Sequence, residues 1–337
     1  MAKRAALERF TSEKELEARR ETILAERKAD KPCISICCGP GCQAIGCAKV
    51  AEAFKDELRK QELTDKVDIK MTGCHGFCEI GPLVVIFPEG ILYQRVTIND
   101  IPDIVSETII KGNIIEKLLF TIPDTKEKVI HENEVPFYKK QKRLVLEANV
   151  YIDPRKIDDY LAYGGYKAIA RVLREIRPQQ VIDEVKSSGL RGRGGGGFPT
   201  GVKWQSSRDA KGDIKYIICN CDEGDPGAFM DRSLMEGNPH SVLEGMIIGA
   251  YAIGANEGYI YIRNEYPIVV KNAEIAIKQA EDYGLLGKNI LGSGFDFTVK
   301  INRGGGAFVC GESTALMASL EGKVGDPRPK YVHTSEK

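Results

Sequence analysis

The sequence lacks a long apolar run and an excess of charge of either sign. No apolar segment reaches the ~20 residues that a helix needs to cross a bilayer. The N-terminus, Met1-Ala2-Lys3-Arg4-Ala5, has no apolar core of a signal sequence. Basic and acidic residues number 48 each among 337, so no overall field favours nucleic acid or an anionic membrane. We therefore expect a globular cytoplasmic protein with no nucleic-acid partner and no membrane insertion.

Cysteine is the residue type whose distribution is uneven. Of the ten cysteines, seven lie between Cys33 and Cys78, and the others are Cys219, Cys221 and Cys310. In a reducing compartment, such a dense group favours metal binding over disulfide formation.

Two cysteine pairs follow two predicted strands, 33–37 and 67–71. The pairs are Cys37-x4-Cys42 and Cys74-x3-Cys78. Four thiolates suit tetrahedral zinc or an iron–sulfur cluster, and this spacing favours a [2Fe–2S] cluster over zinc. On the residues alone, Cys38 is an alternative to Cys37.

Three further residues of this region are assigned other roles. We expect His75 to lie at the surface or to support the ligands rather than to bind metal. Cys33 and Cys47 are expected to be buried thiols, the usual fate of a free cysteine.

The pattern of apolar residues divides the chain into four segments. Residues 1–31 predict a charged, solvated helical arm, with Leu7, Leu16 and Ile23 at loose helical spacing. Residues 32–112 predict a small α/β domain with a hairpin at Pro88-Glu89-Gly90 and a closing helix over 101–110. Residues 113–150 predict a linker whose basic run, 139–143, is a solvated face. Residues 151–337 predict a larger α/β domain.

A glycine-rich stretch, 190–204, is the main feature of the larger domain. Six glycines within 192–201 allow a ligand to lie against the backbone, with charge from Arg193 and Lys203. A flexible linker or an RNA-binding arginine–glycine segment is the alternative. A structured anion-binding loop is favoured because the motif occurs once, between two amphipathic segments, and ends where a helix can start, at Pro199-Thr200-Gly201.

Two other loops are predicted to join this glycine loop at the ends of strands. An acidic loop follows the predicted strand 216–219, and the segment 303–313 follows the predicted strand 297–301. The carboxylates of the acidic loop suit sugar hydroxyls, and Phe198 suits stacking on a planar ring. The three loops together predict a nucleotide or flavin site, with a Mg²⁺ site or a plain acidic turn as alternatives for the acidic loop.

Four motifs stand in the order found in a known family: 191–204, 219–232, 259–267 and 310–322. They resemble the flavin-carrying, NADH-oxidising subunit of respiratory complex I and its soluble relatives. Residues 32–112 resemble the thioredoxin-like [2Fe–2S] domain fused ahead of the flavin domain in many of those relatives. With Gly-Asp-Pro-Arg-Pro-Lys at 325–330, the arrangement looks most like the flavin subunit of NAD-linked, electron-bifurcating hydrogenases.

The resemblance implies a fold and a set of site residues. The fold is α/β, with an N-terminal thioredoxin-like ferredoxin domain followed by a Rossmann-like α/β FMN-binding domain. The implied cluster ligands are Cys37, Cys42, Cys74 and Cys78. The implied contacts to FMN come from Gly192, Arg193, Gly194, Lys203, Asn220, Asp222, Glu223, Gly311 and Glu312, and those to NADH from Gly195, Phe198, Lys203 and Asp225.

The sequence departs from the family pattern at three places. Phe308 stands where the family often has Tyr, and Ser313 stands where it often has a second Glu. The sequence ends at Lys337, before a further FMN-contacting loop, a ubiquitin-like domain and a helical [4Fe–4S] domain of the family. We expect either a fragment or a pocket that a partner completes.

The resemblance implies an NAD(H)-dependent oxidoreductase subunit. Hydride passes between NADH and FMN, and single electrons pass to or from iron–sulfur clusters, so no catalytic side chain is needed. The implied partners are the iron–sulfur and hydrogenase or dehydrogenase subunits of a redox complex. A complex I or formate dehydrogenase subunit is the alternative within this class, and a non-enzymatic zinc- and nucleotide-binding module is the alternative outside it.

Overall fold

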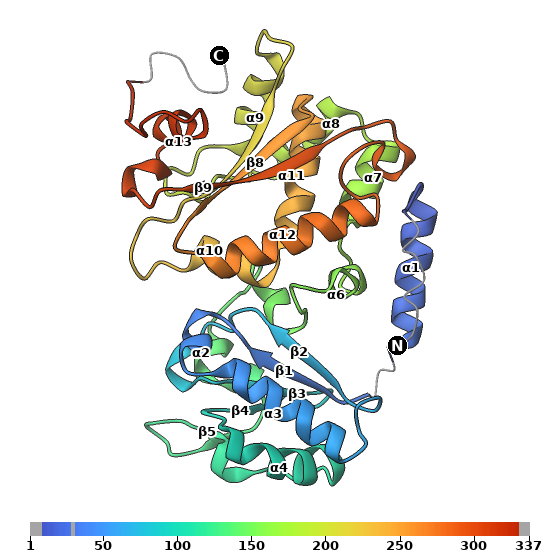
Figure 1. Ribbon diagram of the computed structural model, residues 1–337, viewed down its shortest axis with the longest axis vertical. Coiled ribbons are helices and arrows are strands. Elements are labelled where there is room, and N and C mark those ends of the chain that lie inside the picture. The colour runs from blue at the N-terminus through green and yellow to red at the C-terminus, as the bar shows by residue number, and fades with distance from the viewer. Residues whose placement is uncertain (1–8, 28–30, 330–337) are drawn as a thin grey trace. The chain divides into compact units, whose positions relative to one another are not determined.

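The computed structural model describes residues 9–27 and 31–329 (Figure 1). The chain forms two compact units, which we describe separately. The N-terminal unit contains Glu21–Tyr163 and Glu236–Asn238, and the C-terminal unit contains the segment up to Arg20, Gly164–Met235 and the chain from Pro239 onward. Among residues 9–27 and 31–329, no helix is both long and apolar enough to span a bilayer.

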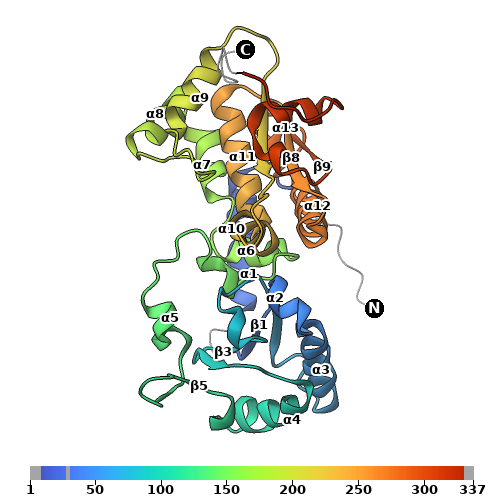
Figure 2. The same ribbon diagram turned by 90° about the vertical axis from the view of Figure 1, so that its left-hand side faces the viewer.

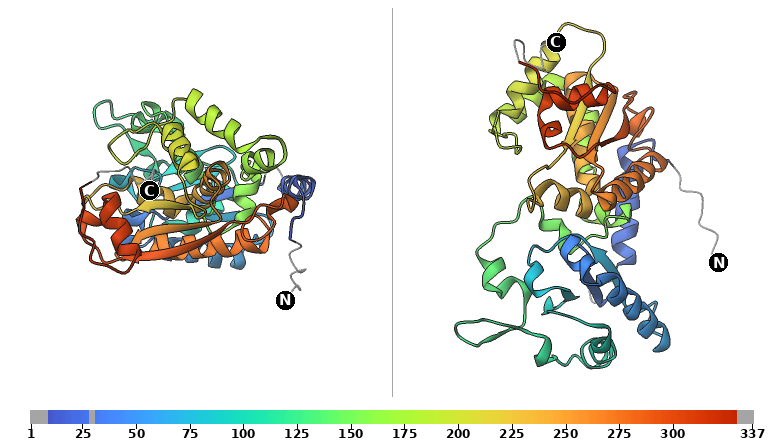
Figure 3. Two further views of the ribbon diagram at one scale, coloured as in Figure 1. Left: turned by 90° about the horizontal axis from the view of Figure 1, so that it is seen from above. Right: turned by 60° about the vertical axis from the view of Figure 1, so that its left-hand side comes forward.

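The N-terminal unit is built on a four-stranded sheet in the order β2-β1-β3-β4. β1 pairs in parallel with β2 and antiparallel with β3, and β3 and β4 form the predicted hairpin. Helix α3 contacts β1 and β2 (Figure 3). In chain order the elements are β1 (Cys33–Cys37), α2 (Pro40–Ala44), α3 (Cys47–Lys60), β2 (Asp68–Thr72), β3 (Val84–Phe87), β4 (Ile91–Tyr93), α4 (Ile101–Asp103), η3 (Ile104–Ile110), β5 (Phe120–Thr121), β6 (Lys128–Val129), α5 (Pro136–Lys139) and α6 (Ile157–Ala162).

Residues 113–150 differ from the predicted linker, although the lysines of their basic run are exposed as expected. They contribute buried side chains to the core of the N-terminal unit, namely Leu118, Leu119, Phe120, Val129, Val135, Tyr138 and Val150. Main-chain bonds also join the segment to the hairpin, because the Leu92 N–H donates to the Ile130 oxygen over 2.8 Å. These apolar residues come in runs too short to show a helical or strand period, yet burying them removes apolar surface from water. The domain limits drawn at 112 and 150 stay a prediction.

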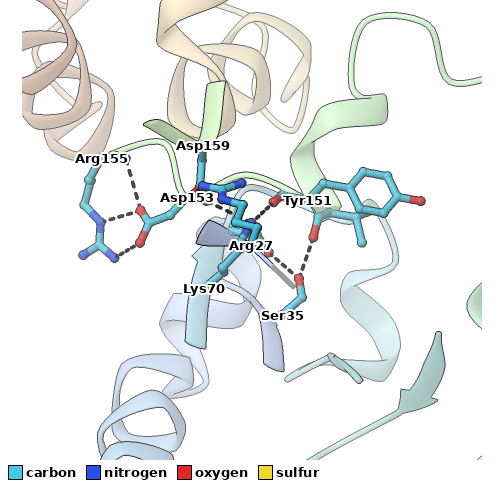
Figure 4. A network of polar contacts seen from close by, with 9 residues as sticks. Arg27, Ser35, Lys70, Tyr151, Asp153, Arg155 and Asp159 are labelled. Carbon is cyan, nitrogen blue, oxygen red and sulfur yellow. Dashed lines mark hydrogen bonds and ion pairs between the residues drawn. The ribbon is translucent and has the colours of Figure 1, made fainter. Parts of the chain in front are cut away.

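A buried carboxylate, Asp159 of α6, holds several segments of the N-terminal unit together (Figure 4). It pairs with the Arg27 guanidinium and with Lys70 Nζ of β2, the latter over 3.2 Å. It also accepts the Asp153 N–H over 2.9 Å. Lys70 Nζ donates in addition to the Tyr151 oxygen over 2.8 Å. The network therefore ties α6, β2 and the chain around Arg27 to one anion.

We predict that Asp159→Asn lowers the free energy of unfolding by about 2–3 kcal/mol, because the amide leaves two partly buried cations without a counter-charge. Urea unfolding followed by circular dichroism measures the loss. Asp65→Asn, at an exposed carboxylate of the same unit, is the control. An equal, small effect of both substitutions would contradict this role of Asp159.

The C-terminal unit is built on a three-stranded parallel sheet in the order β7-β8-β9. Helix α11 contacts β7 and β8, and α12 contacts β9 (Figure 1). Helices α7, α8 and α9 also contact α11 (Figure 2). In chain order the elements are α7 (Lys167–Glu175), α8 (Pro178–Ser187), α9 (Thr200–Asp209), β7 (Tyr216–Cys221), α10 (Met230–Gly237), α11 (Pro239–Ile253), β8 (Glu257–Arg263), α12 (Pro267–Asp282), β9 (Thr298–Gly304) and α13 (Ser313–Leu320).

The predicted arm contains a helix, α1 (Glu13–Glu26), but this helix is not a solvated one. Phe10, Leu16 and Ile23 are buried, as is Arg20. Leu7 lies outside the described residues. Leu24 is exposed, so the helix buries part of its apolar residues and leaves the others in solvent.

Candidate functional site

The two cysteine loops begin at one edge of the N-terminal sheet. β1 and β2 are parallel, and their last residues, Cys37 and Thr72, are partners in the register. The Cys38 N–H continues the ladder by donating to the Thr72 oxygen over 3.0 Å. Loops that leave neighbouring parallel strands start side by side, which is why two pairs distant in sequence meet here.

The four predicted ligands are in contact with one another. Cys37 hydrogen-bonds with both Cys42 and Cys74, and Cys74 hydrogen-bonds with Cys78. The contact with Cys42, together with burial, raises the pKa of the Cys37 thiol to about 12. Because metals bind the thiolate form, loading this site must release protons. Over the described residues, no group of three or more His, Cys, Asp or Glu has the arrangement of a single-ion site.

The structure separates Cys38 from this group. Cys38 hydrogen-bonds with Cys47 of α3 instead, and both thiols are buried. Cys33 lies at the opposite end of β1 from the loops and is only partly buried, which corrects the expectation of a buried thiol. Desolvation still raises its pKa to about 11. These contacts favour Cys37 over Cys38 as a ligand, and the ligand set itself stays a proposal.

Three glycines surround the four thiols closely enough to exclude any side chain. A Cβ at Gly39 would lie 2.6 Å from Cys74 Cβ, one at Gly41 would lie 3.0 Å from Cys78 Sγ, and one at Gly81 would lie 2.8 Å from Cys42 Sγ. The His75 N–H donates to Cys37 Sγ over 3.5 Å, and the Gly76 N–H donates to Cys74 Sγ over 3.3 Å. Four thiols with main-chain donors to sulfur in a tight cradle fit a [2Fe–2S] cluster.

His75 is buried rather than exposed, which corrects one of the two expectations for it. Its Nε2 lies 2.8 Å from Thr72 Oγ1, and its Nδ1 has no hydrogen-bond partner among the described groups. Burial lowers the pKa of His75 to about 3, so the imidazole is neutral. The ring supports the loop between Cys74 and Cys78 from its inner side.

In the C-terminal unit, the acidic loop and the segment after β9 meet at one edge of the parallel sheet. Asn220 Nδ2 donates to the Gly311 oxygen over 2.9 Å. A Cβ at Gly311 would lie 3.0 Å from the Asp222 oxygen, and one at Gly224 would lie 2.8 Å from Phe308 Cδ2. Two of the three loops predicted to converge therefore do so, with main chain against main chain.

Arg263, at the end of β8, is the residue of this site that sequence reasoning missed. Its Nη1 donates to Asp222 Oδ1 over 2.7 Å, and its Nη2 donates to the Gly306 oxygen over 2.7 Å. It thus fixes both converging loops. Its position within the motif 259–267, as the last residue of β8, was the available signal, because ligand-binding loops begin at such strand ends.

Asp222 keeps one carboxylate oxygen without a partner. The residue is 8% exposed, and Oδ2 has no hydrogen bond among the described groups. Burial raises the pKa of Asp222, although the Arg263 guanidinium opposes the shift. A buried acceptor without a donor is costly, so this oxygen fits the hydroxyl of a ligand.

The carboxylates of Glu223 and Glu312 accept hydrogen bonds from main-chain N–H groups of the residues that follow them. Glu223 accepts the Met230 and Arg232 N–H groups over 2.8 and 3.1 Å at the start of α10. Glu312 is the N-cap of α13 and accepts the Thr314 and Ala315 N–H groups over 2.8 and 3.1 Å. Both carboxylates therefore shape their loops, and their predicted contacts with a cofactor stay predictions.

The glycine loop is a closed, structured loop rather than a flexible linker. The Gly192 N–H donates to the Phe198 oxygen over 2.9 Å, and Arg191 Nη1 donates to the Gly197 oxygen over 3.0 Å. Gly195 and Gly197 have φ of +98° and +59°, values that glycine adopts readily. Among the described residues, no hydrogen bond or ion pair joins this loop to the acidic loop.

The remaining predicted contacts of the glycine loop are open to solvent. Arg193, Gly194, Gly195, Phe198 and Lys203 are exposed, and so is Asp225 in the acidic loop. A Cβ at Gly194 or Gly195 would meet nothing within 4 Å. The main chain here is free to contact a ligand directly.

Comparison with known proteins finds a matching family model within each unit. Residues 185–336 match the Nuo51 FMN-binding domain, and residues 22–108 match the thioredoxin-like [2Fe–2S] ferredoxin. The chain is 57% identical over 192 residues to the NADP-reducing hydrogenase subunit HndC of Solidesulfovibrio fructosivorans, covering 57% of this chain and 39% of that subunit. It is 51% identical over 187 residues to the NADH-quinone oxidoreductase F 2 subunit of Rhizobium meliloti (strain 1021), covering 55% of this chain and 44% of that protein.

A solved structure also aligns with most of the chain. An air-oxidized NAD⁺-reducing [NiFe]-hydrogenase aligns with a TM-score of 0.45 and 24% identity, covering 94% of this chain and 51% of that one. The chain spans about two fifths of the length of the two curated relatives.

Proposed function

Since residues 185–336 match the Nuo51 FMN-binding domain and residues 22–108 match the thioredoxin-like [2Fe–2S] ferredoxin, we propose that the chain is an NADH-oxidising flavoprotein subunit. The expected cofactors, FMN and a [2Fe–2S] cluster, are those of the two families. One observation carries the proposal: a single chain contains both kinds of site. Four cysteine thiols are in contact in the N-terminal unit, and the strand-end loops of the C-terminal unit contain a buried carboxylate oxygen of Asp222 that has no partner among the described groups.

The C-terminal unit would hold FMN through its loops. The flavin supplies the hydride and one-electron chemistry when bound. The exposed N–H groups of the glycine loop, with Arg193 and Lys203, suit the phosphate. Asp222 Oδ2 suits a hydroxyl of the ribityl chain, and the exposed Phe198 suits stacking on the nicotinamide side. Asn220, Glu223, Gly311 and Glu312 complete the proposed lining.

The N-terminal unit would hold the cluster on Cys37, Cys42, Cys74 and Cys78. The chain's contribution is to keep four thiols in place and to direct two N–H groups at sulfur, which tunes the reduction potential. The thiols need no side-chain base nearby, because transfer of single electrons moves no proton at these atoms.

The relatives support a place in a multisubunit redox complex. The two curated relatives are named as subunits, one of a hydrogenase and one of an NADH-quinone oxidoreductase. We propose that this chain likewise passes electrons between NAD(H) and iron–sulfur subunits, in the cytoplasm. Electron bifurcation stays a prediction.

Asp225 is proposed to select NADH over NADPH, because its exposed carboxylate would repel the extra phosphate. This choice needs a test, since one relative is named for NADP reduction. We expect Asp225→Asn to lower the NADH/NADPH ratio of kcat/KM about tenfold, which corresponds to ~1.4 kcal/mol.

The measurement is ferricyanide reduction by the anaerobic, FMN-loaded chain with each nucleotide. Asp213→Asn, at another exposed carboxylate of the same unit, is the control. An unchanged ratio in Asp225→Asn would rule out this role of Asp225. A chain that takes up FMN and reduces ferricyanide with neither nucleotide would contradict the proposed function.

A further inference from the structure

An aromatic stack fixes the segment that follows β6 onto the second cysteine loop. Phe77 lies between Cys74 and Cys78, and its ring stacks on Phe137 of α5, with centroids 4.3 Å apart and planes inclined by 19°. A Cβ at Gly76 would lie 3.8 Å from Phe137 Cε1. Helix α5 is therefore held against the loop that carries two of the proposed ligands.

A second set of contacts fixes the chain beyond α5. Tyr138 is buried and meets Phe77 edge-on, with centroids 6.1 Å apart. The Arg143 guanidinium lies 4.7 Å from the centre of the Tyr138 ring and 3.5 Å from a Glu132 carboxylate oxygen. The stretch 137–143 is thus anchored at both ends, and its position beside the thiols is defined.

Three cations on this stretch have no carboxylate partner. Lys139, Lys140 and Lys142 are exposed, and none of them forms an ion pair within the described residues. Other lysines of the same unit are paired, for example Lys111 with Glu107 over 2.6 Å. Over 132–143 the chain carries four cations against two carboxylates, of which Glu132 is neutralised by Arg143. Because the whole chain is balanced at 48 charges of each sign, this positive surface is a local feature.

The proposed cluster site is open to solvent at the loop that contacts Phe137. Cys78 and Gly76 are exposed, and Phe137 is 37% exposed. A hollow of about 590 Å³ lies next to the stack, and its charged lining is formed by Lys128, Lys139 and Lys140 together with Glu127 and Glu134. An apolar centre flanked by unpaired charges of one sign is the arrangement that small, transient protein interfaces use for steering.

We propose that Phe137, Lys139, Lys140 and Lys142 form a docking surface, here called the basic platform, for an acidic one-electron carrier protein. This inference rests on the proposed function, because it gives the proposed cluster an external partner. One electron passes from the reduced cluster to the oxidised carrier, or in reverse, and no bond or proton is exchanged. A redox protein is favoured over a membrane or a nucleic acid because the charges follow directly on Phe137, which stacks on an exposed ligand loop, and form no long basic stripe.

The test compares two haem proteins of opposite charge. The full chain, with its cluster reduced by one equivalent of dithionite, is mixed in a stopped-flow instrument with acidic cytochrome b5 or basic cytochrome c. Electron transfer is followed at the haem α-band. The variants are Lys139→Glu/Lys140→Glu and, as a matched control, Lys60→Glu/Lys66→Glu, whose exposed lysines lie at and beyond the end of α3 remote from Cys47.

We expect Lys139→Glu/Lys140→Glu to lower the second-order rate with cytochrome b5 about tenfold and to raise it with cytochrome c, because steering of this kind changes association rates ten- to a thousandfold. The difference should vanish at ~1 M salt, where the Debye length is about 3 Å. The control should change either rate by less than about twofold.

Three results would overturn the basic platform. The first is an equal rate with cytochrome b5 in both variants. The second is an equal loss with both cytochromes, which indicates damage to the cluster rather than lost steering. The third is a change confined to NADH-driven reduction of the cluster within the chain, which would assign the surface to the chain's own C-terminal unit. A chain without iron–sulfur absorbance would instead contradict the proposed function itself.

Discussion

Cys42→Ser is expected to remove the visible iron–sulfur absorbance of the anaerobically purified protein and to lower bound iron and sulfide by about tenfold or more. Cys42 hydrogen-bonds with Cys37 and is enclosed by Gly81, so a serine oxygen would replace a buried thiolate at the centre of the site. Iron, acid-labile sulfide and the absorption spectrum, each per chain, give the measurement.

Two matched controls come from the same unit. Cys33→Ser changes a thiol at the far end of β1, and Cys38→Ser changes the thiol that contacts Cys47. We expect both variants to keep the cluster. If Cys33→Ser and Cys42→Ser lose the cluster to the same extent, the proposed ligand set is wrong. If Cys38→Ser loses the cluster and Cys37→Ser keeps it, Cys38 is the ligand in place of Cys37.

Gly194→Leu is expected to weaken FMN binding by about ten- to a hundredfold while leaving the fold intact. A Cβ at Gly194 would meet nothing within 4 Å, and its φ lies outside the left-handed region. The protein alone therefore accommodates the side chain, whereas a flavin lying against the backbone would clash at a cost of about 1–3 kcal/mol. Fluorescence titration with FMN measures the affinity, and thermal unfolding verifies the fold.

Gly196→Leu is the control for this substitution. Gly196 belongs to the same loop and has the same open surroundings, but it is not among the proposed FMN contacts. We expect it to reduce FMN affinity far less. Equal weakening by both variants would mean that the loop as a whole, rather than Gly194, limits binding, and no weakening in either would place the flavin elsewhere.

Regular alternation made the small sheet predictable from the sequence. The strand predicted over 33–37 is β1, and the strand predicted over 67–71 is β2, one residue later at Asp68–Thr72. The hairpin at Pro88-Glu89-Gly90 is also confirmed. These elements have one buried face and flanking turn residues, so local pattern and tertiary packing favour the same structure.

Helices α11 and α5 could not be predicted, because their residues show no amphipathic periodicity. Helix α11 (Pro239–Ile253) is apolar nearly all round, with ten buried residues, and a helix buried on all sides has no amphipathic period. Helix α5 has four residues, and its role depends on Phe77, which lies about 60 positions earlier. A contact between such distant residues depends on tertiary packing that no local window of sequence contains.

The spacing of residues along the chain predicted only part of the two candidate sites. Cys-x4-Cys and Cys-x3-Cys after two strands predicted the meeting of four thiols, because parallel strands bring their loops to one edge. Spacing could not separate Cys37 from Cys38, which are neighbours in the chain but contact different cysteines. Arg263 lies within the motif 259–267, but it was missed because the resemblance implied no role for it.

The recognised families agree with the expectation drawn from the four motifs. The matched ranges, 22–108 and 185–336, include the cysteine pairs and all three loops of the C-terminal unit. The assignment of individual residues to FMN, NADH and the cluster stays a proposal, which the substitutions above test one at a time.

The most direct test of the account is the cofactor content of the whole chain, purified without oxygen. We expect two irons and two acid-labile sulfides per chain, together with FMN that binds in a one-to-one ratio and is bleached by NADH. Zinc in place of iron, with no acid-labile sulfide and no flavin uptake, would contradict it and favour a zinc- and nucleotide-binding module.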